Sequence, residues 1–231
     1  MITKIFHISD LHFRLYQRHK EFNSVLRNFI LYVEKNKDEN SIIFIGGDVV
    51  HSKTEMSPEL FQVVSRFLKD CADTCTTVLT PGNHDGNLSN SNRLDALTPV
   101  VDAMNHPNLH YWKDSGVYRL MDTTFSLFGI FDSPDKWVYA KDIPEDFKIA
   151  LHHGPLIGSR TDLITIQHGT NPSVFDGFDI VMLGDIHLEQ TIQEFSIGIG
   201  KAKSRGKVPV VKYSGSAVQQ DHGESIDRHG F

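Results

Sequence analysis

One loop of the chain reads Thr80-Pro81-Gly82-Asn83-His84-Asp85-Gly86 and directly follows the apolar run Thr77-Val78-Leu79. It places an amide oxygen, an imidazole and a carboxylate side by side. Pro, Gly, Asn and Asp would also form an ordinary turn, so this short motif has two interpretations, a turn or the edge of an active site. The ends of the other apolar runs decide between them.

Four further apolar runs end in side chains that could bind metal. Residues 3–9 lead into Asp10-Leu11-His12, and residues 41–45 lead into Gly46-Gly47-Asp48. Residues 148–151 lead into His152-His153, and residues 179–183 lead into Gly184-Asp185-Ile186-His187. Five such endings are hard to explain as separate turns. Because ligand sites gather at the carboxyl ends of parallel strands, we expect these side chains to meet in one crevice.

Helical patterns separate the first three runs. Apolar residues recur at three- and four-residue spacing from Phe22 to Val33 and again from Leu60 to Leu68. Ser57 and Pro58 form a favourable start for the second helix, and residues 98–104 are consistent with a third. Alternation of strand and helix predicts a largely parallel sheet.

The second half of the chain changes character. Residues 109–112, 116–120 and 124–130 are closely spaced strand candidates, which indicates a second sheet of partly antiparallel hairpins. Residues 158–170 are interpreted as a loop or short helix, and the basic stretch 201–207 as an exposed loop or hairpin. Residues 208–213 are a last strand candidate, in which Pro209 favours an edge or a strand start.

Composition is that of an ordinary globular chain of 231 residues, which we interpret as one domain, 1–231. The two cysteines, Cys71 and Cys75, suit neither a disulfide framework nor a zinc site. No apolar run approaches the length of a membrane span, which predicts a cytoplasmic protein without a membrane partner. The net charge of −6 argues against a simple basic nucleic-acid binder. An acidic cluster that holds two divalent cations would nevertheless present a positive centre.

The side chains at the five run endings combine carboxylate, amide and imidazole groups without a thiolate. This mixture favours Mn, Fe or Zn over a calcium cage. There are too many for one ion, so we expect two ions about 3.5–4 Å apart with a bridging carboxylate, an arrangement suited to displacement at phosphorus. The candidates are Asp10, His12, Asp48, Asn83, His84, His152 or His153, Asp185 and His187.

In this order the motifs resemble those of the calcineurin-like metallophosphoesterases: Asp-x-His, Gly-Asp, Gly-Asn-His-Asp, His and Gly-His-x-His. The resemblance implies an α/β fold in which two mixed β-sheets are sandwiched and flanked by helices. It also implies a first metal held by Asp10, His12, Asp48 and His187, and a second held by Asp48, Asn83, His152 and Asp185.

Particular roles follow from the same resemblance. Asp48 would bridge the two ions, and His84 would protonate or stabilise the leaving oxygen while Asp85 orients it. The family usually has His at the position of Asp185, which predicts a second site more tolerant of Mn or Mg. His152 is preferred over His153 because it directly follows the apolar run and because Leu151-His152-His153-Gly154 is similar to the family's Leu-His-x-Gly. His153 is then expected to be a structural histidine.

Two stretches resemble the SbcD-like branch of DNA double-strand-break repair nucleases. They are Gly47-Asp48-Val49-Val50-His51 and the ending Tyr213-Ser214-Gly215-Ser216 with Gln219-Gln220, Gly223-Glu224 and Gly230-Phe231. This implies a manganese-dependent DNA exonuclease and endonuclease in which His51 contacts the scissile phosphate. It further implies a homodimer and an ATPase partner of the SbcC type, although the branch's capping and ATPase-binding regions are expected to be absent from these residues. The alternatives are a phosphatase, a cyclic-nucleotide phosphodiesterase or a non-catalytic scaffold.

Overall fold

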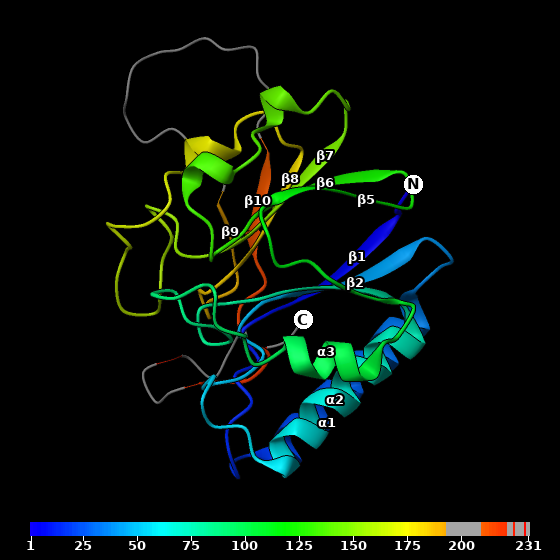
Figure 1. Cartoon of the computed structure of the whole chain (residues 1–231). Coiled ribbons are helices and arrows are strands. Elements are labelled where there is room, and N and C mark those ends of the chain that lie inside the picture. Colours follow the sequence, from blue (N-terminus) through cyan, green and yellow to red (C-terminus); the bar gives the residue numbers. More distant parts are fainter. Residues whose placement is uncertain (193–208, 221–223, 225–228, 230–231) are drawn as a thin grey trace.

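Two β-sheets pack face to face, and three α-helices cover the outer face of one of them (Figure 1). This computed structural model describes residues 1–192, 209–220, 224 and 229. The basic stretch 201–207, Gly223 and the pair 230–231, all considered above, lie outside the described residues. The predicted α/β fold of two sheets flanked by helices is confirmed, whereas the assignment of 1–231 to one domain stays a prediction.

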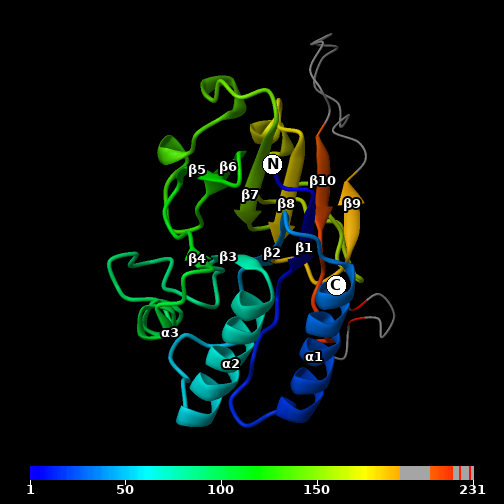
Figure 2. The same cartoon turned by 90° about the vertical axis from the view of Figure 1, so that its right-hand side faces the viewer.

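The first sheet has the strand order β1-β2-β3-β4 and is parallel throughout. Helices connect its strands, and each right-handed crossover moves to the next strand in the same direction, so all three helices lie on one face. Figure 2 shows α1 and α2 beside each other below this sheet. The elements are β1 Lys4–Ile8, α1 His19–Asn36, β2 Ser41–Gly46, α2 Pro58–Thr74, β3 Thr76–Thr80, α3 Thr98–Met104 and β4 Leu109–Tyr111.

The helices form where the periodicity predicts them. Phe22, Leu26, Phe29 and Val33 form the buried stripe of α1, as expected for an amphipathic helix on a sheet. At the start of α2 the Ser57 hydroxyl accepts a hydrogen bond from the Leu60 amide at 3.2 Å, which satisfies one of the free amides of the first turn.

The second sheet has the order β5-β6-β7-β8-β10-β9 and is mixed. Its strands β5 and β6 form the predicted antiparallel hairpin. Strands β6, β7, β8 and β10 run parallel to one another, and β9 is antiparallel to β10. Pro209 lies directly before β10, at a strand start as predicted. The elements are β5 Gly116–Leu120, β6 Thr123–Phe128, η1 Pro134–Lys136, η2 Ala140–Asp142, β7 Lys148–His153, η3 Pro172–Phe175, β8 Ile180–Gly184, β9 Gln190–Ile192 and β10 Val210–Tyr213.

One strand lies in the other sheet from the one expected. Residues 109–112 were grouped above with the second sheet, but β4 pairs with β3 in parallel, with Val78 opposite His110. The prediction is therefore wrong for this strand. The connection through α3 is a third crossover of the same kind as the two before it, and a parallel edge strand follows from it.

Strand β7 is buried on both faces, which matters for the site. Ile149 and Leu151 belong to the core between the two sheets, together with Phe44 of β2. Ala150 belongs to the core on the outer face, beneath the 3₁₀ segments. Alternate residues of a strand face opposite sides of the sheet. The position of each residue along β7 therefore decides which of the two cores its side chain faces. Within the described ranges, no helix is long and apolar enough to cross a membrane.

Candidate metal centre

The polar residues that follow the strands have an unusual backbone. Asp10, His12, Asp48 and Asp185 all have positive φ, at 54°, 47°, 52° and 93°. This conformation costs free energy for residues other than glycine, and residues that adopt it cluster at active sites. The exits of β1 and β2 are also held together, because the amide of His12 donates to the carbonyl of Asp48 at 2.9 Å.

Glycines are required beside these residues because the strand ends approach closely. A Cβ on Gly82 would lie 2.1 Å from Oδ1 of Asp48. On Gly184 it would lie 2.2 Å from the carbonyl oxygen of Gly46 and 2.7 Å from Nδ1 of His153. Real Cβ contacts are not this short, so the glycines in the Gly-Asn-His-Asp and Gly-Asp motifs allow strands of both sheets to converge.

A first group of ligand atoms gathers at the end of β1. Asp10, His12 and His187 each offer one atom within 4.8 Å of the others. Nε2 of His12 lies 3.0 Å from Nε2 of His187 and 3.5 Å from Oδ2 of Asp48. The amide of Asp185 donates to both carboxylate oxygens of Asp10, at 2.9 and 3.1 Å, so β1 and β8 meet here. These side chains belong to the set predicted for the first ion.

A second group lies on the other side of Asp48. Nε2 of His153 lies 3.0 Å from Oδ1 of Asn83, 3.4 Å from Oδ2 of Asp48 and 3.8 Å from Oδ1 of Asp185. Oδ2 of Asp48 is therefore close to one imidazole of each group, at 3.5 Å from His12 and 3.4 Å from His153. A carboxylate between two half-sites is the geometry that a bridging ligand needs.

Of the two adjacent histidines, His153 lies at the cluster and His152 does not. His153 shares the face of Ile149 and Leu151 and points to the cluster, whereas His152 shares the face of Ala150 and points away. The ring of His152 contacts the carbonyl of Phe128 at 2.8 Å through Nδ1 and the hydroxyl of Thr170 at 3.1 Å through Nε2. Strand parity therefore brings His153, rather than the predicted His152, to the other candidate ligands.

Two further imidazoles stand next to the first group. The rings of His51 and His84 stack with centroids 5.4 Å apart and planes 25° apart. The ring of His84 also meets that of His12 edge-on at 4.7 Å. Nδ1 of His84 lies 2.6 Å from the carbonyl oxygen of His51, so this contact orients the His84 ring and leaves Nε2 for a ligand.

The carboxylate of Asp85, which was predicted to orient His84, contacts backbone amides instead of the His84 ring. It is fully buried, and its carboxylate accepts hydrogen bonds from the amides of Val50 at 2.9 Å and Gly82 at 2.9 Å. The bond from Val50 joins the loop after β2 to the loop after β3, and the bond from Gly82 closes the latter loop. Asp85 therefore positions the loops that carry Asp48 and His84, while the orientation of the His84 ring comes from the His51 carbonyl.

The charges at this edge fit bound cations. Burial raises the pKa of Asp10 to about 6, and burial with the nearby Asp48 charge raises the pKa of Asp85 to about 7. Burial alone would also raise the pKa of Asp48, but His153 holds it well below its usual range. Burial lowers the pKa of His12 to about 2, so this imidazole is neutral, the form that binds metal. Crowded buried carboxylates with neutral imidazole suit divalent cations.

Sequence reasoning assigned no individual role to Glu224, which was noted only as part of a terminal motif. Oε1 of Glu224 lies 2.6 Å from Nδ1 of His187, and Oε2 accepts from the amide of Gln220 at 2.7 Å. A carboxylate behind a metal-binding histidine fixes its ring and tautomer. Because Glu224 is 37 residues beyond His187, only the fold brings the pair together.

Comparison with known proteins agrees with this geometry. A profile described as calcineurin-like phosphoesterase matches residues 3–189, so the chain belongs to the calcineurin-like phosphoesterase family. Members of this family of metallophosphoesterases bind two divalent metal ions. The uncharacterized protein R555 of Acanthamoeba polyphaga mimivirus is 37% identical over 243 residues, which cover 100% of this chain and 17% of that protein. The chain thus spans about a sixth of that relative's length.

Among solved structures, the chain is similar to a 5'-nucleotidase precursor from Thermus thermophilus. The TM-score is 0.49 at 11% sequence identity, and the match covers 92% of this chain and 48% of that one. The SbcD-like branch stays a prediction, as do the individual ligand roles.

Proposed function

We propose that the chain is a DNA nuclease that hydrolyses phosphodiester bonds with two divalent cations. We expect both cations to be Mn²⁺, and Mg²⁺, Fe²⁺ or Zn²⁺ are alternatives. The observation that carries this proposal is the stacked pair of His51 and His84 beside the carboxylate cluster. Two neighbouring imidazoles can contact a phosphate oxygen and the leaving oxygen of one phosphodiester together.

The ligands would divide around Asp48. Asp10, His12 and His187 would hold one cation, while Asn83, His153 and Asp185 would hold the other, with Asp48 between them. When bound, such a pair of cations activates a water molecule and stabilises charge on the phosphate oxygens.

The protein's own groups then handle the substrate. Nε2 of His84 would give a proton to the leaving oxygen, because its Nδ1 is occupied by the His51 carbonyl. The ring of His51 would contact a phosphate oxygen beside it. General-acid catalysis of this kind contributes roughly 10²–10⁴-fold in rate.

Basic side chains around the site support a polyanionic substrate. Each of four loops that leave strand ends at this edge carries at least one arginine or lysine, although the net charge of the chain is −6. Sequence-independent binding of nucleic acid depends on such contacts with phosphates. Four of these side chains, one from each loop, are Arg14, Lys53, Arg93 and Arg160.

One assay with Mn²⁺ tests the proposal: end-labelled linear DNA is compared with p-nitrophenyl phosphate, bis(p-nitrophenyl) phosphate and cyclic nucleotides. We expect nucleotides to be released from DNA, and the Asp48→Ala variant to release none. His84→Ala should retain Mn²⁺ binding in calorimetry and lose roughly 10²–10⁴-fold in rate. Hydrolysis of small esters alone, with DNA left intact, would overturn the nuclease proposal.

The remaining partners stay predictions. A homodimer and an ATPase subunit of the SbcC type rest on the resemblance of the terminal motif. Sedimentation of the purified chain checks the first, and co-purification with a candidate ATPase checks the second.

A further inference from the structure

A well-ordered hairpin with an apolar tip leaves the site edge just after His153. Within the hairpin, which spans residues 158–166, the amide of Gly158 donates to Ile166 at 2.9 Å and the amide of Ile166 donates to Ser159 at 2.8 Å. At its turn, the hydroxyl of Thr161 accepts from the amides of Leu163 and Ile164, at 3.2 and 3.1 Å. The turn is therefore held in one conformation.

The stem of the hairpin is attached to the second sheet. The amide of Arg160 donates to the side chain of Gln190 at 2.9 Å, and that side chain donates back to the carbonyl of Arg160 at 2.7 Å. Below it, the hydroxyl of Tyr213 accepts from the amide of Leu156 at 2.9 Å and donates to the carbonyl of Gly154 at 2.9 Å. The hairpin is thus fixed to β9 and β10, which belong to the same sheet as the strands that carry His153 and Asp185.

The tip holds two adjacent aliphatic side chains in water. Leu163 is 80% exposed and Ile164 is 62% exposed. A single exposed aliphatic residue is ordinary, but ordering a turn costs conformational entropy. Here the order exposes two large apolar groups next to each other. Such a pair on a fixed turn indicates a contact surface for a ligand.

A second loop with exposed aliphatic side chains leaves the site edge after Asn83 and His84. Leu88 is 54% exposed and Leu94 is 71% exposed, and the exposed Arg93 lies next to Leu94. In Figure 1 this teal-green loop and the yellow-green hairpin both project to the left of the molecule. Each therefore combines exposed aliphatic side chains with an exposed arginine, Arg93 in one and Arg160 in the other.

We propose that Leu163 and Ile164, here called the apolar tip, contact the faces of unpaired bases of a nucleic-acid strand whose phosphodiester lies in the metal centre. This proposal rests on the proposed nuclease function. Leu and Ile side chains insert between base steps in many nucleic-acid complexes, and the nearby Arg160 would contact the strand's phosphates.

Aliphatic groups cannot hydrogen-bond base edges, and base faces are open only at unpaired or terminal positions, so the substrate class is DNA with single-stranded or frayed ends.

Binding of fluorescein-labelled oligonucleotides, followed by anisotropy with Ca²⁺ in place of Mn²⁺, tests the proposal separately from cleavage. The ligands are a single strand, a forked duplex and a duplex closed by hairpins at both ends. The variants are Leu163→Ser/Ile164→Ser, the conservative Leu163→Met/Ile164→Val, and Leu31→Ser, which changes an exposed leucine on α1.

We expect the native chain to bind the single strand and the fork more tightly than the closed duplex. The double serine variant should lose roughly five-fold or more in affinity for the single strand and the fork, which is the lower end of the affinity that one base contact contributes. The Leu163→Met/Ile164→Val and Leu31→Ser variants should keep the native affinity. If the double serine variant binds DNA as tightly as the native chain and still cleaves it, the proposed base contact of the apolar tip is wrong and the nuclease proposal stands.

Two other outcomes also overturn the proposal. If the native chain neither binds nor cleaves any of the DNA ligands, both the apolar tip and the nuclease function are wrong. If the serine variant changes only the sedimentation of the protein and leaves DNA binding unchanged, the tip is a protein contact.

Discussion

The imidazole of His153 is fixed by contacts at both of its nitrogens. Nδ1 donates to the carbonyl of Gly46 at 2.7 Å, which directs Nε2 at Asn83 and Asp48. Burial would lower the pKa of His153, but the charge of Asp48 raises it to about 10. A divalent cation at Nε2 would take the place of the second proton, which Nε2 carries when the ring is charged.

This geometry gives a prediction for the two adjacent histidines. Loss of a residue that supports a metal ligand from behind weakens metal binding by roughly 10–100-fold. His153→Ala, which removes a ligand itself, should weaken Mn²⁺ binding by at least as much. His152→Ala should leave Mn²⁺ affinity unchanged and lower the thermal stability instead, because it removes a buried ring packed on Trp137 and Phe175. Calorimetric titration of both variants measures this, and the opposite ranking would restore His152 as the ligand.

The site residues that could be predicted are those that directly follow a strand. Asp10, Asp48 and Asp185 were found because each comes at the end of an apolar run, where parallel strands place ligands. The same rule failed for His152 and His153, because β7 is apolar on both faces and periodicity alone does not say which face meets the site. The orienting role of Glu224 depends on a long-range contact with His187, for which the sequence holds no local signal.

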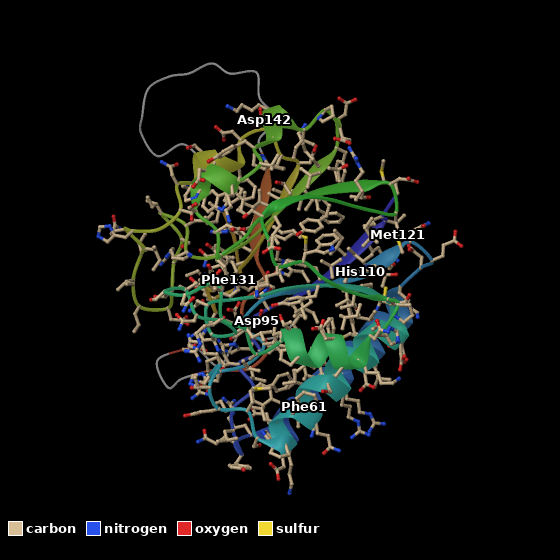
Figure 3. The ribbon with its side chains drawn as sticks, viewed as in Figure 1. Phe61, Asp95, His110, Met121, Phe131 and Asp142 are labelled. Carbon is tan, nitrogen blue, oxygen red and sulfur yellow. The ribbon has the colours of Figure 1, made fainter. Side chains whose placement is uncertain are left out.

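At the scale of elements, α3 is anchored by one buried carboxylate. Oδ1 of Asp95 accepts from the amides of Leu97 and Thr98 at 2.9 and 2.7 Å, and Oδ2 pairs with Nζ of Lys113 at 2.9 Å. Nζ of Lys113 lies 5.7 Å from the centre of the Phe131 ring, and Figure 3 labels both Asp95 and Phe131. Asp95 thereby joins the end of the Asn83–His84 loop to the segment after β4.

Asp95→Asn tests this anchor. Burial would raise the pKa of Asp95, but hydrogen bonds from Lys113 and Thr98 hold it below its usual range. The stability it provides is therefore complete at neutral pH and is lost as the pH falls through the lowered pKa. We expect the variant to lose about 1–3 kcal/mol of unfolding free energy at pH 7, and the difference from the native chain to shrink below about pH 4.

Urea unfolding at a series of pH values measures the effect of Asp95→Asn. The matched control is Asp102→Asn, which changes an exposed carboxylate on the same helix. A loss of the same size in Asp102→Asn, or a difference that does not depend on pH, would contradict the assigned role of Asp95.

The element order could be predicted better than the division into sheets. Helices α1 and α2 have wide apolar stripes, and the structure has both where expected. Strand β4 was assigned to the wrong sheet because three short apolar runs follow each other closely, and sequence spacing does not say which of them begins the second sheet. The pairing of β4 with β3 depends on the third crossover, through α3.

At the scale of the whole molecule, the metal centre joins both sheets. Asp10, Asp48 and Asn83 follow strands of the first sheet, whereas His153 ends β7 and Asp185 follows β8 in the second. This convergence was predicted from the five run endings. The face-to-face packing of the two sheets was expected only from the family resemblance, since the strand patterns themselves do not say which face of each strand is covered.

A centre built from both sheets exists only in the folded chain, so cations that bind it should stabilise the whole fold. At a free Mn²⁺ concentration of about 100 times Kd, the gain is about 2.7 kcal/mol. For a chain of this length, each kcal/mol raises Tm by about 2–4 °C, so Mn²⁺ should raise Tm by about 5–11 °C and EDTA should reverse it. Scanning calorimetry measures the shift.

Asp48→Ala should abolish the shift in Tm, because both groups of ligands lose a member. Glu34→Ala, which removes an exposed carboxylate on α1, should leave the shift unchanged. An equal shift in Asp48→Ala would mean that the cations stabilise the chain from some other place.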